Sequence, residues 1–201
     1  MNLHLTRILG ITLAALALLL AGCEGTIRHM REVPAAAAPV APEPGKAMVV
    51  FMRPSGLGFA IQSSVFEIKD NYPALVGIVA AKTMVAHQVN PGKYLFMVIG
   101  ENADFMTAEL VAGKTYYVRV EPRFGMWKAR FGLQPVQQKN LAGAEFAGDL
   151  KDCKWVEKNA DSESWASGAM VSIQSKRTEY YADWIKQADA ERPHLRPEDG
   201  I

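Results

Sequence analysis

Apolar residues follow three different patterns along the chain, and each pattern predicts a different kind of structure. Residues 8–20 are a long apolar run, residues 47–136 hold short apolar runs separated by turn residues, and residues 161–191 carry apolar residues at steps of three and four. Short runs with a period of two are typical of β-strands, whereas steps of three and four are typical of one face of an α-helix. The sequence therefore predicts a mainly β protein with a C-terminal amphipathic α-helix.

The region 47–136 is a series of strand candidates. Residues 94–99 are apolar at every position, which is typical of a strand covered on both faces. Residues 115–121 alternate between a Tyr/Val face and a face that carries Arg and Glu. Within residues 59–69 the apolar phase changes midway, as a β-bulge or a bend requires. Many short strands of this kind predict an antiparallel β-sandwich of the immunoglobulin or transthyretin-like type.

Composition divides the rest of the chain. The expected segments are a lipoprotein signal peptide at 1–22, a lipid anchor and Ala/Pro-rich tether at 23–46, the β-sandwich at 47–136, a loop or connection at 137–160, the helix at 161–191 and a flexible tail at 192–201. Asp161 is of a type favoured as a helix N-cap, and Pro193 cannot continue a helix. The helix either packs its apolar stripe on the sheet, which we favour, or presents it to a partner.

Residues 20–23, Leu-Ala-Gly-Cys, have the form of a bacterial lipobox. They follow a short segment with Arg7 and an apolar run that is shorter than the roughly 20 residues a membrane-spanning helix needs. We expect cleavage between Gly22 and Cys23 and attachment of lipid, palmitate included, to Cys23. The alternative is a signal segment that is retained as an anchor.

The residues after the lipobox predict where the protein lies. In lipoproteins of enteric-type Gram-negative bacteria, Asp after the lipidated cysteine favours the inner membrane, and this chain has Glu24 there. We therefore expect an outer-membrane protein that faces the periplasm. The Ala/Pro-rich segment 23–46 favours extended geometry at about 3.1 Å per residue, which would hold the domain up to roughly 70 Å from the lipid. A proline motif docked by a partner is the alternative.

Three motifs carry a resemblance to a known family. They are residues 51–54 (Phe-Met-Arg-Pro), 90–94 (Asn-Pro-Gly-Lys-Tyr) and 110–120 (Leu-Val-Ala-Gly-Lys-Thr-Tyr-Tyr-Val-Arg-Val). With them the chain resembles proteobacterial lipoproteins that share the domain of unknown function 2846. The resemblance covers roughly residues 46–136 and implies a β-sandwich in the cell envelope. It supplies no catalytic residues, and it leaves the C-terminal helix unexplained.

Charge and cysteine content argue against nucleic-acid binding and against a function that needs a reactive thiol. Without Arg7 the 22 basic residues fall to 21, which balances the 21 acidic residues, so no basic surface for nucleic acid is indicated. If Cys23 is lipidated, Cys153 has no partner for an internal disulfide. We expect Cys153 to be buried, because no cluster of His or Lys suggests an activated thiolate.

The sequence contains few residues that could catalyse a reaction or bind a metal. No Gly-x-Ser-x-Gly motif is present, and His87 is the only histidine outside the expected tether, tail and signal peptide. Met84 and His87 are three apart in a strand and so lie on opposite faces, which excludes a shared copper ion. We therefore expect no catalytic residue, no cofactor and no metal site.

Aromatic residues indicate a binding surface instead. The candidate partner-binding residues are Phe124, Trp127, Arg130, Tyr181 and Ile185. The expected function is a non-catalytic binding or assembly module for an envelope protein or glycan. The alternatives are an envelope enzyme or enzyme subunit acting on peptidoglycan or glycan, and a structural lipoprotein of a secretion machine. A catalytic His87 requires a concave pocket beside a carboxylate or hydroxyl, whereas a binding module requires an exposed apolar patch.

Overall fold

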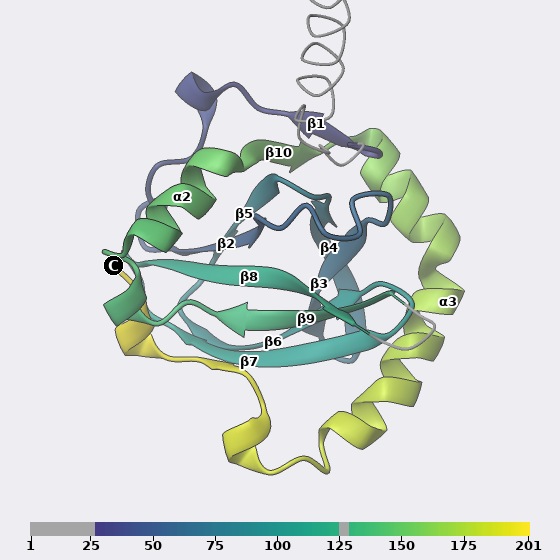
Figure 1. Cartoon of the computed structure of the whole chain (residues 1–201). Helices are drawn as coiled ribbons and strands as arrows, with labels where there is room; N and C mark the ends of the chain where they lie inside the picture. The colour runs from purple at the N-terminus through teal and green to yellow at the C-terminus, as the bar shows by residue number, and fades with distance from the viewer. Residues whose placement is uncertain (1–26, 125–128) are drawn as a thin grey trace, which may run out of the picture.

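Two β-sheets packed face to face form the body of the protein, with helices against their outer sides (Figure 1). The computed structural model describes residues 27–124 and 129–201. The first sheet has the order β1 (Met30–Glu32), β10 (Lys154–Lys158), β5 (Thr83–Val89), β2 (Ala47–Arg53), β8 (Thr115–Phe124) and β9 (Ala129–Pro135). The second has the order β11 (His194–Leu195), β7 (Ala103–Leu110), β6 (Gly92–Ile99), β3 (Ser63–Lys69) and β4 (Tyr72–Val79).

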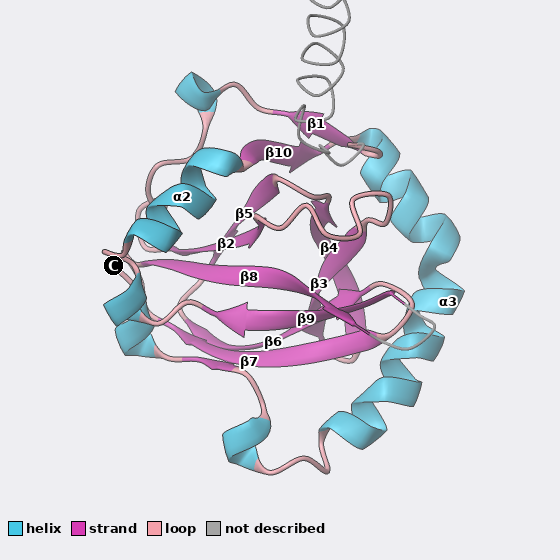
Figure 2. Cartoon of the chain, viewed as in Figure 1, coloured by secondary structure: helices cyan, strands magenta, loops and turns pink. Residues whose placement is uncertain are grey.

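The mainly β fold with a C-terminal helix is confirmed (Figure 2). The described helices are α2 (Ala144–Asp152) and α3 (Ala160–Trp184), with short 3-10 turns η1 (Ala35–Ala37), η2 (Gln138–Asn140), η3 (Asp189–Glu191) and η4 (Pro197–Asp199). Most strand pairs are antiparallel, but β2–β8, β5–β10 and β7–β11 are parallel, so both sheets are mixed. Parallel pairing arises because the chain passes through other strands or a helix before it returns to pair.

Each helix covers one outer face of the sandwich. Phe51 and Phe96 meet edge to face between the sheets, with ring centroids 5.1 Å apart. On the far side of the second sheet, Phe105 lies 5.2 Å from the ring of Tyr181 in α3. On the far side of the first sheet, Tyr117 lies 4.8 Å from Phe146 in α2. The central strands are therefore buried on both faces, as the continuous apolar runs predicted.

One local prediction from the strand pattern is confirmed. The register of β3 against β4 shifts between Val65 and Phe66, where the apolar phase changes, and Val76 of β4 is the extra residue. Asp70 and Asn71 both have positive φ, 47° and 66°, which forms the tight turn between these strands.

The predicted boundaries of the C-terminal half are wrong in two places. Residues 137–160, expected to be loop, contain α2 and the strand β10. The helix expected at 161–191 begins at Ala160 and ends at Trp184. Its N-cap is Asn159, whose side chain accepts a hydrogen bond from the Ser162 backbone N–H at 3.0 Å while the Ser162 hydroxyl accepts one from Asn159 N–H.

The two ends of the described chain are bound to the domain, contrary to prediction. Residues 27–46, which we call the N-terminal strap, were expected to be part of an extended tether, yet β1 pairs with β10. The tail 192–201 was expected to be flexible, yet β11 pairs with β7, and Ile201 exchanges two backbone hydrogen bonds with Thr115 at 2.7 and 3.0 Å. Composition alone does not reveal these pairings, because both partners lie far away in the sequence.

Candidate functional site

A buried acid and a histidine meet between the two sheets. Glu67 of β3 and His87 of β5 both point into the sandwich, and Glu67 Oε2 lies 2.8 Å from His87 Nε2. Only 2% of the surface of Glu67 is exposed, whereas His87 is half-buried. Because β3 and β5 belong to different sheets, this contact, which we call the cross-sheet pair, joins the two layers directly.

Strand alternation explains how the cross-sheet pair arises. Glu67 has the same phase as the buried Val65, and His87 has the same phase as Val85 and Val89. Lys69, two residues after Glu67, shares its face, and the Lys69 ammonium lies 3.2 Å from Glu67 Oε1. Each oxygen of the Glu67 carboxylate therefore has its own positively polarised partner.

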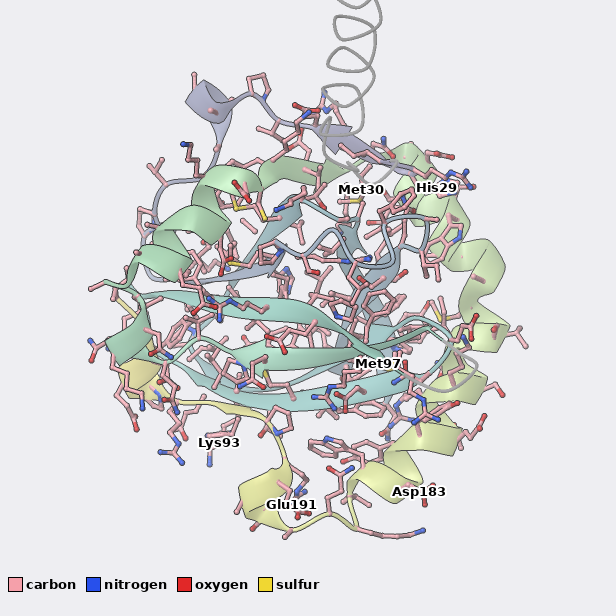
Figure 3. All side chains as sticks on the ribbon, in the orientation of Figure 1. His29, Met30, Lys93, Met97, Asp183 and Glu191 are labelled. Carbon is pink, nitrogen blue, oxygen red and sulfur yellow. The ribbon has the colours of Figure 1, made fainter. Side chains whose placement is uncertain are left out.

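The cross-sheet pair forms the floor of a hollow of about 420 Å³, the cross-sheet pocket. Its walls are Lys46, Glu67, Ile68, Lys69, His87, Gln88, Val89, Asn90, Pro91, Gly92, Lys93 and Tyr94. Asn90 organises the rim, since its side-chain oxygen accepts a hydrogen bond from Lys46 Nζ at 2.8 Å and its backbone oxygen accepts one from the Tyr94 hydroxyl at 2.6 Å. Lys93 is exposed and extends into solvent (Figure 3).

Aromatic rings support the pair from below. Tyr94 stacks on Phe96 at 5.8 Å, and His87 meets the same Phe96 ring edge-on at 6.2 Å. These contacts restrict the orientation of the imidazole ring. The pair at the floor of the pocket is therefore packed against aromatic rings, and the rim is charged and polar.

The electrostatics of the pocket follow from burial and pairing. Burial alone would raise the pKa of Glu67, but the hydrogen bonds and positive charges of His87 and Lys69 outweigh it, and the pKa of Glu67 is lowered. The pKa of Tyr94 is raised, first by burial and then by the charge of Glu67. Glu67 is therefore an anion at neutral pH, and the nitrogen that faces it, His87 Nε2, carries a proton and donates it.

The pocket contains charged groups that could bind a ligand and a histidine that could act as a base, but it contains few nucleophiles. Its lining contains no Ser, Thr or Cys. Within the described residues, no group of three or more His, Cys, Asp or Glu side chains is placed to hold a metal ion. No helix in residues 27–124 and 129–201 is both long and apolar enough to cross a membrane.

The candidate residues from the sequence are not brought together. Cys23, Gly22 and Trp127 lie outside the described residues, and Phe124 is the last residue of β8. Arg130 is exposed on β9, in register with Arg123.

Tyr181 and Ile185 lie at the far end of α3. Tyr181 packs inward, 5.2 Å from Phe105 and 5.7 Å from Trp184, whereas Ile185 is half exposed. The apolar stripe of α3 therefore packs on the sheet, as we favoured. His87 was the candidate base in the sequence, but Glu67 was not recognised. The available signal was a charged residue in the apolar phase of a strand.

A second exposed feature is the loop 54–62, which we call the Arg53 loop. Its side chains Leu57, Phe59 and Ile61 are 46%, 45% and 37% exposed. The buried guanidinium of Arg53 holds the loop by donating to the carbonyls of Ile61, Leu57 and Gly58 at 2.6, 2.7 and 2.8 Å. Burial lowers the pKa of Arg53 to about 10. In the described part of the chain, no other stretch has three large apolar side chains exposed at every second position.

A larger hollow, of about 520 Å³, lies between β9 and the C-terminal segment. Its charges are partly paired, with Arg192 bound to Asp189 and Arg123 within 3.5 Å of Asp104. The free edge of β9 is also protected, because the side chain of Asn102 bonds both the N–H and the C=O of Phe131 at 3.1 and 3.4 Å. We therefore place the candidate site at the cross-sheet pocket.

Comparison of the sequence with models of known protein families gave no match, and comparison with curated proteins gave none either. The resemblance to lipoproteins with domain of unknown function 2846 therefore stays a prediction. The geometry of the cross-sheet pocket is what bears on function.

Proposed function

We propose that the chain is an outer-membrane lipoprotein, anchored through lipid on Cys23, whose β-sandwich faces the periplasm and binds an envelope protein or glycan without catalysing a reaction. The observation that carries the proposal is the cross-sheet pair at the floor of a preformed hollow. A carboxylate buried inside a β-sandwich costs desolvation energy, and apolar residues would pack there at lower cost. The pair lies at the floor of a hollow in the sandwich, which supports a ligand-binding role.

The lipid supplies the second part of the mechanism. An anchor confines the domain to the membrane surface and raises its effective concentration for partners in the same layer. A weak pocket is then sufficient for recruitment. The lipobox at residues 20–23 supports the anchor.

An envelope enzyme acting on peptidoglycan or another glycan is the second candidate. It is favoured by the position of His87 in a hollow beside a carboxylate, the arrangement that a catalytic histidine requires. With no Ser, Thr or Cys in the lining, His87 would have to act on water. Binding requires no such additional partner and is therefore our proposal.

Crosslinked pull-down of the full-length lipidated protein from its own envelope tests the binding function. Glu67→Gln keeps the shape of the side chain and removes its charge, and Glu109→Gln, on an exposed position of β7, is the matched control. We expect the wild type and the control to capture the same partner and Glu67→Gln to lose it. Equal capture by the wild type, Glu67→Gln and Glu109→Gln would show that the pocket does not bind the partner. Release of soluble fragments from peptidoglycan by the wild type but not by His87→Gln would establish the enzyme instead.

The lipid anchor has its own test. We expect Cys23→Ala to abolish metabolic labelling with palmitate, because the thiol that receives the lipid is gone. Cys153→Ala is the control and should keep the label. Labelling that persists in Cys23→Ala would refute the anchor while leaving the pocket untouched.

A further inference from the structure

We infer that the cross-sheet pocket binds a small anionic group, a carboxylate or a phosphate, carried by the ligand. This inference rests on the proposed binding function and names the chemistry of its ligand. The basis is that the lysines of the pocket keep hydrogen-bond donors that no residue of the pocket uses.

The lining is positive in balance. Lys46, Lys69 and Lys93 contribute three positive charges, and Glu67 is the single carboxylate among the lining residues. Both oxygens of Glu67 are already engaged, one by His87 and the other by Lys69. A cationic ligand would therefore meet lysines on the rim and a carboxylate whose two oxygens each already have a partner, which makes a cation the less favourable ligand.

Hydrogen-bond donors remain available for an anion. An ammonium group has three donors, and Lys46 Nζ uses one on Asn90 while Lys69 Nζ uses one on Glu67. His87 uses its Nε2 proton on Glu67, so the lysines supply the donors that remain for a ligand. Charge-assisted hydrogen bonds from lysine to carboxylate or phosphate are stronger than those between neutral groups.

The pocket is less suited to an uncharged sugar. Sugars are commonly held by an open aromatic face, but the ring of Tyr94 is stacked on Phe96 and its hydroxyl is bound to the Asn90 carbonyl. The hollow of about 420 Å³ is of the size that accommodates a small ligand group. An acidic group on a peptide end or on an acidic glycan fits both the size and the charge.

The lysines are held before the ligand arrives. Asn90 lies in the turn between β5 and β6, and it fixes both the Lys46 ammonium and the Tyr94 hydroxyl. Glu67 fixes the Lys69 ammonium. Side chains that are already ordered lose less conformational entropy on binding, which favours affinity.

Titration calorimetry on the full-length lipidated protein in detergent tests the inference, at constant ionic strength, with inorganic phosphate and acetate as separate probes. We expect saturable binding of at least one probe with a dissociation constant on the order of 1 mM. The double variant Lys46→Gln with Lys69→Gln should weaken binding by about tenfold or more. The matched control, Lys139→Gln with Lys151→Gln, removes two lysines outside the pocket and should bind as the wild type does.

The outcomes separate the possibilities. Binding of phosphate alone assigns a phosphate ligand, binding of acetate alone assigns a carboxylate ligand, and either result lost in the pocket variant supports the inference. Weaker binding in the control than in the pocket variant would place the anion in the larger hollow, which Lys139 lines, and would overturn it. No binding of either probe would also overturn it. The proposed function would still stand in these cases if Glu67→Gln loses the partner in the pull-down.

Discussion

A carboxylate inside a β-sandwich is stable only when its charge is compensated, and Glu67 has two partners that do so. Its pKa is lowered in the folded protein, so the folded state binds fewer protons than the unfolded state at mildly acidic pH. The resulting stabilisation is fully present above the unfolded pKa of about 4.3 and is lost as the pH falls through the lower, folded pKa. The cross-sheet pair is thus a contribution to stability that acid removes.

Glu67→Gln tests this contribution. At pH 7 we expect the free energy of unfolding to fall by about 1.5–3 kcal/mol, the range for hydrogen bonds to charged groups. The difference from the wild type should shrink as the pH approaches 3, because protonated glutamic acid resembles glutamine. Urea unfolding at several pH values measures it. A difference that stays constant with pH would contradict the assignment, and Glu109→Gln is the control that should show little difference at any pH.

Cys153 is a buried thiol, as the sequence predicted. Burial raises its pKa to about 12, and the charges of Asp149 and Asp152 add to the effect. Since the thiolate is the reactive form, we expect Cys153 in the folded protein to resist Ellman's reagent at pH 8 and to react once the protein is unfolded in guanidinium. Rapid reaction in the folded protein would show that the thiol is accessible and the assignment wrong.

Single residues were predictable where the local pattern carried the information. The burial of Cys153 follows from residue type. The partner of His87 does not, because Glu67 lies 20 residues away in a strand of the other sheet. Pairing between sheets depends on how the layers align, and a single sequence contains no direct record of that alignment.

At the scale of elements, alternation predicted the strands well and composition predicted the connections poorly. The strands predicted at 94–99 and 115–121 lie within β6 and β8, because the first run is apolar throughout and the second alternates. Helix α2 was missed because it has only nine residues, is mostly exposed and buries only Phe146. Strand β10 was missed because five residues acquire strand geometry through pairing with β1 and β5.

The Arg53 loop depends on a single side chain at the end of β2. Arg53→Ala removes the three hydrogen bonds to the loop carbonyls. It also leaves a cavity on the face of the Phe131 ring, where Arg53 Cζ lies 4.6 Å from the ring centroid. We expect a loss of stability on the order of 3 kcal/mol and faster cleavage by chymotrypsin at Leu57 or Phe59. Limited proteolysis measures the cleavage. Arg31→Ala, in an exposed ion pair with Glu157, is the control and should leave the cleavage rate unchanged, so equal rates in both variants would contradict the role of Arg53.

At the scale of the whole molecule, the N-terminal strap changes how the domain would sit on a membrane. The strap is bound to the domain near its start, with Met30 buried next to Ser162, His29 Nδ1 2.8 Å from Asp161 and Val33 N–H bonded to the Trp155 carbonyl at 2.8 Å (Figure 3). Further along, Gln88 bonds the backbone of both Ala41 and Glu43. The expected reach of roughly 70 Å required this segment to be free and extended.

If Cys23 carries a lipid, the bound strap leaves only a short link to it. Ile27 is the first described residue and packs partly on the core, and Cys23 precedes it by four residues. Four residues span at most about 14 Å when fully extended. If Cys23 carries the lipid, the strap therefore holds the domain close to the membrane with one end, where β1 and the start of α3 lie, toward the bilayer (Figure 1). Partners within reach would be those at the membrane surface.

Releasing the strap should restore the longer reach. Met30→Asp places a charge in a buried site, and we expect it to detach β1 from β10 while the two main sheets remain folded. Energy transfer from a dye on a cysteine introduced at Ile201 to an acceptor in the lipid vesicle reports the distance of the domain from the membrane. The wild type should give efficient transfer with a narrow distribution, and Met30→Asp should give weaker transfer with a broad one. Val40→Asp, at a side chain that is 91% exposed, is the matched control and should behave as the wild type. Equal transfer in Met30→Asp and the wild type, with circular dichroism confirming that both are folded, would show that the strap does not set the distance.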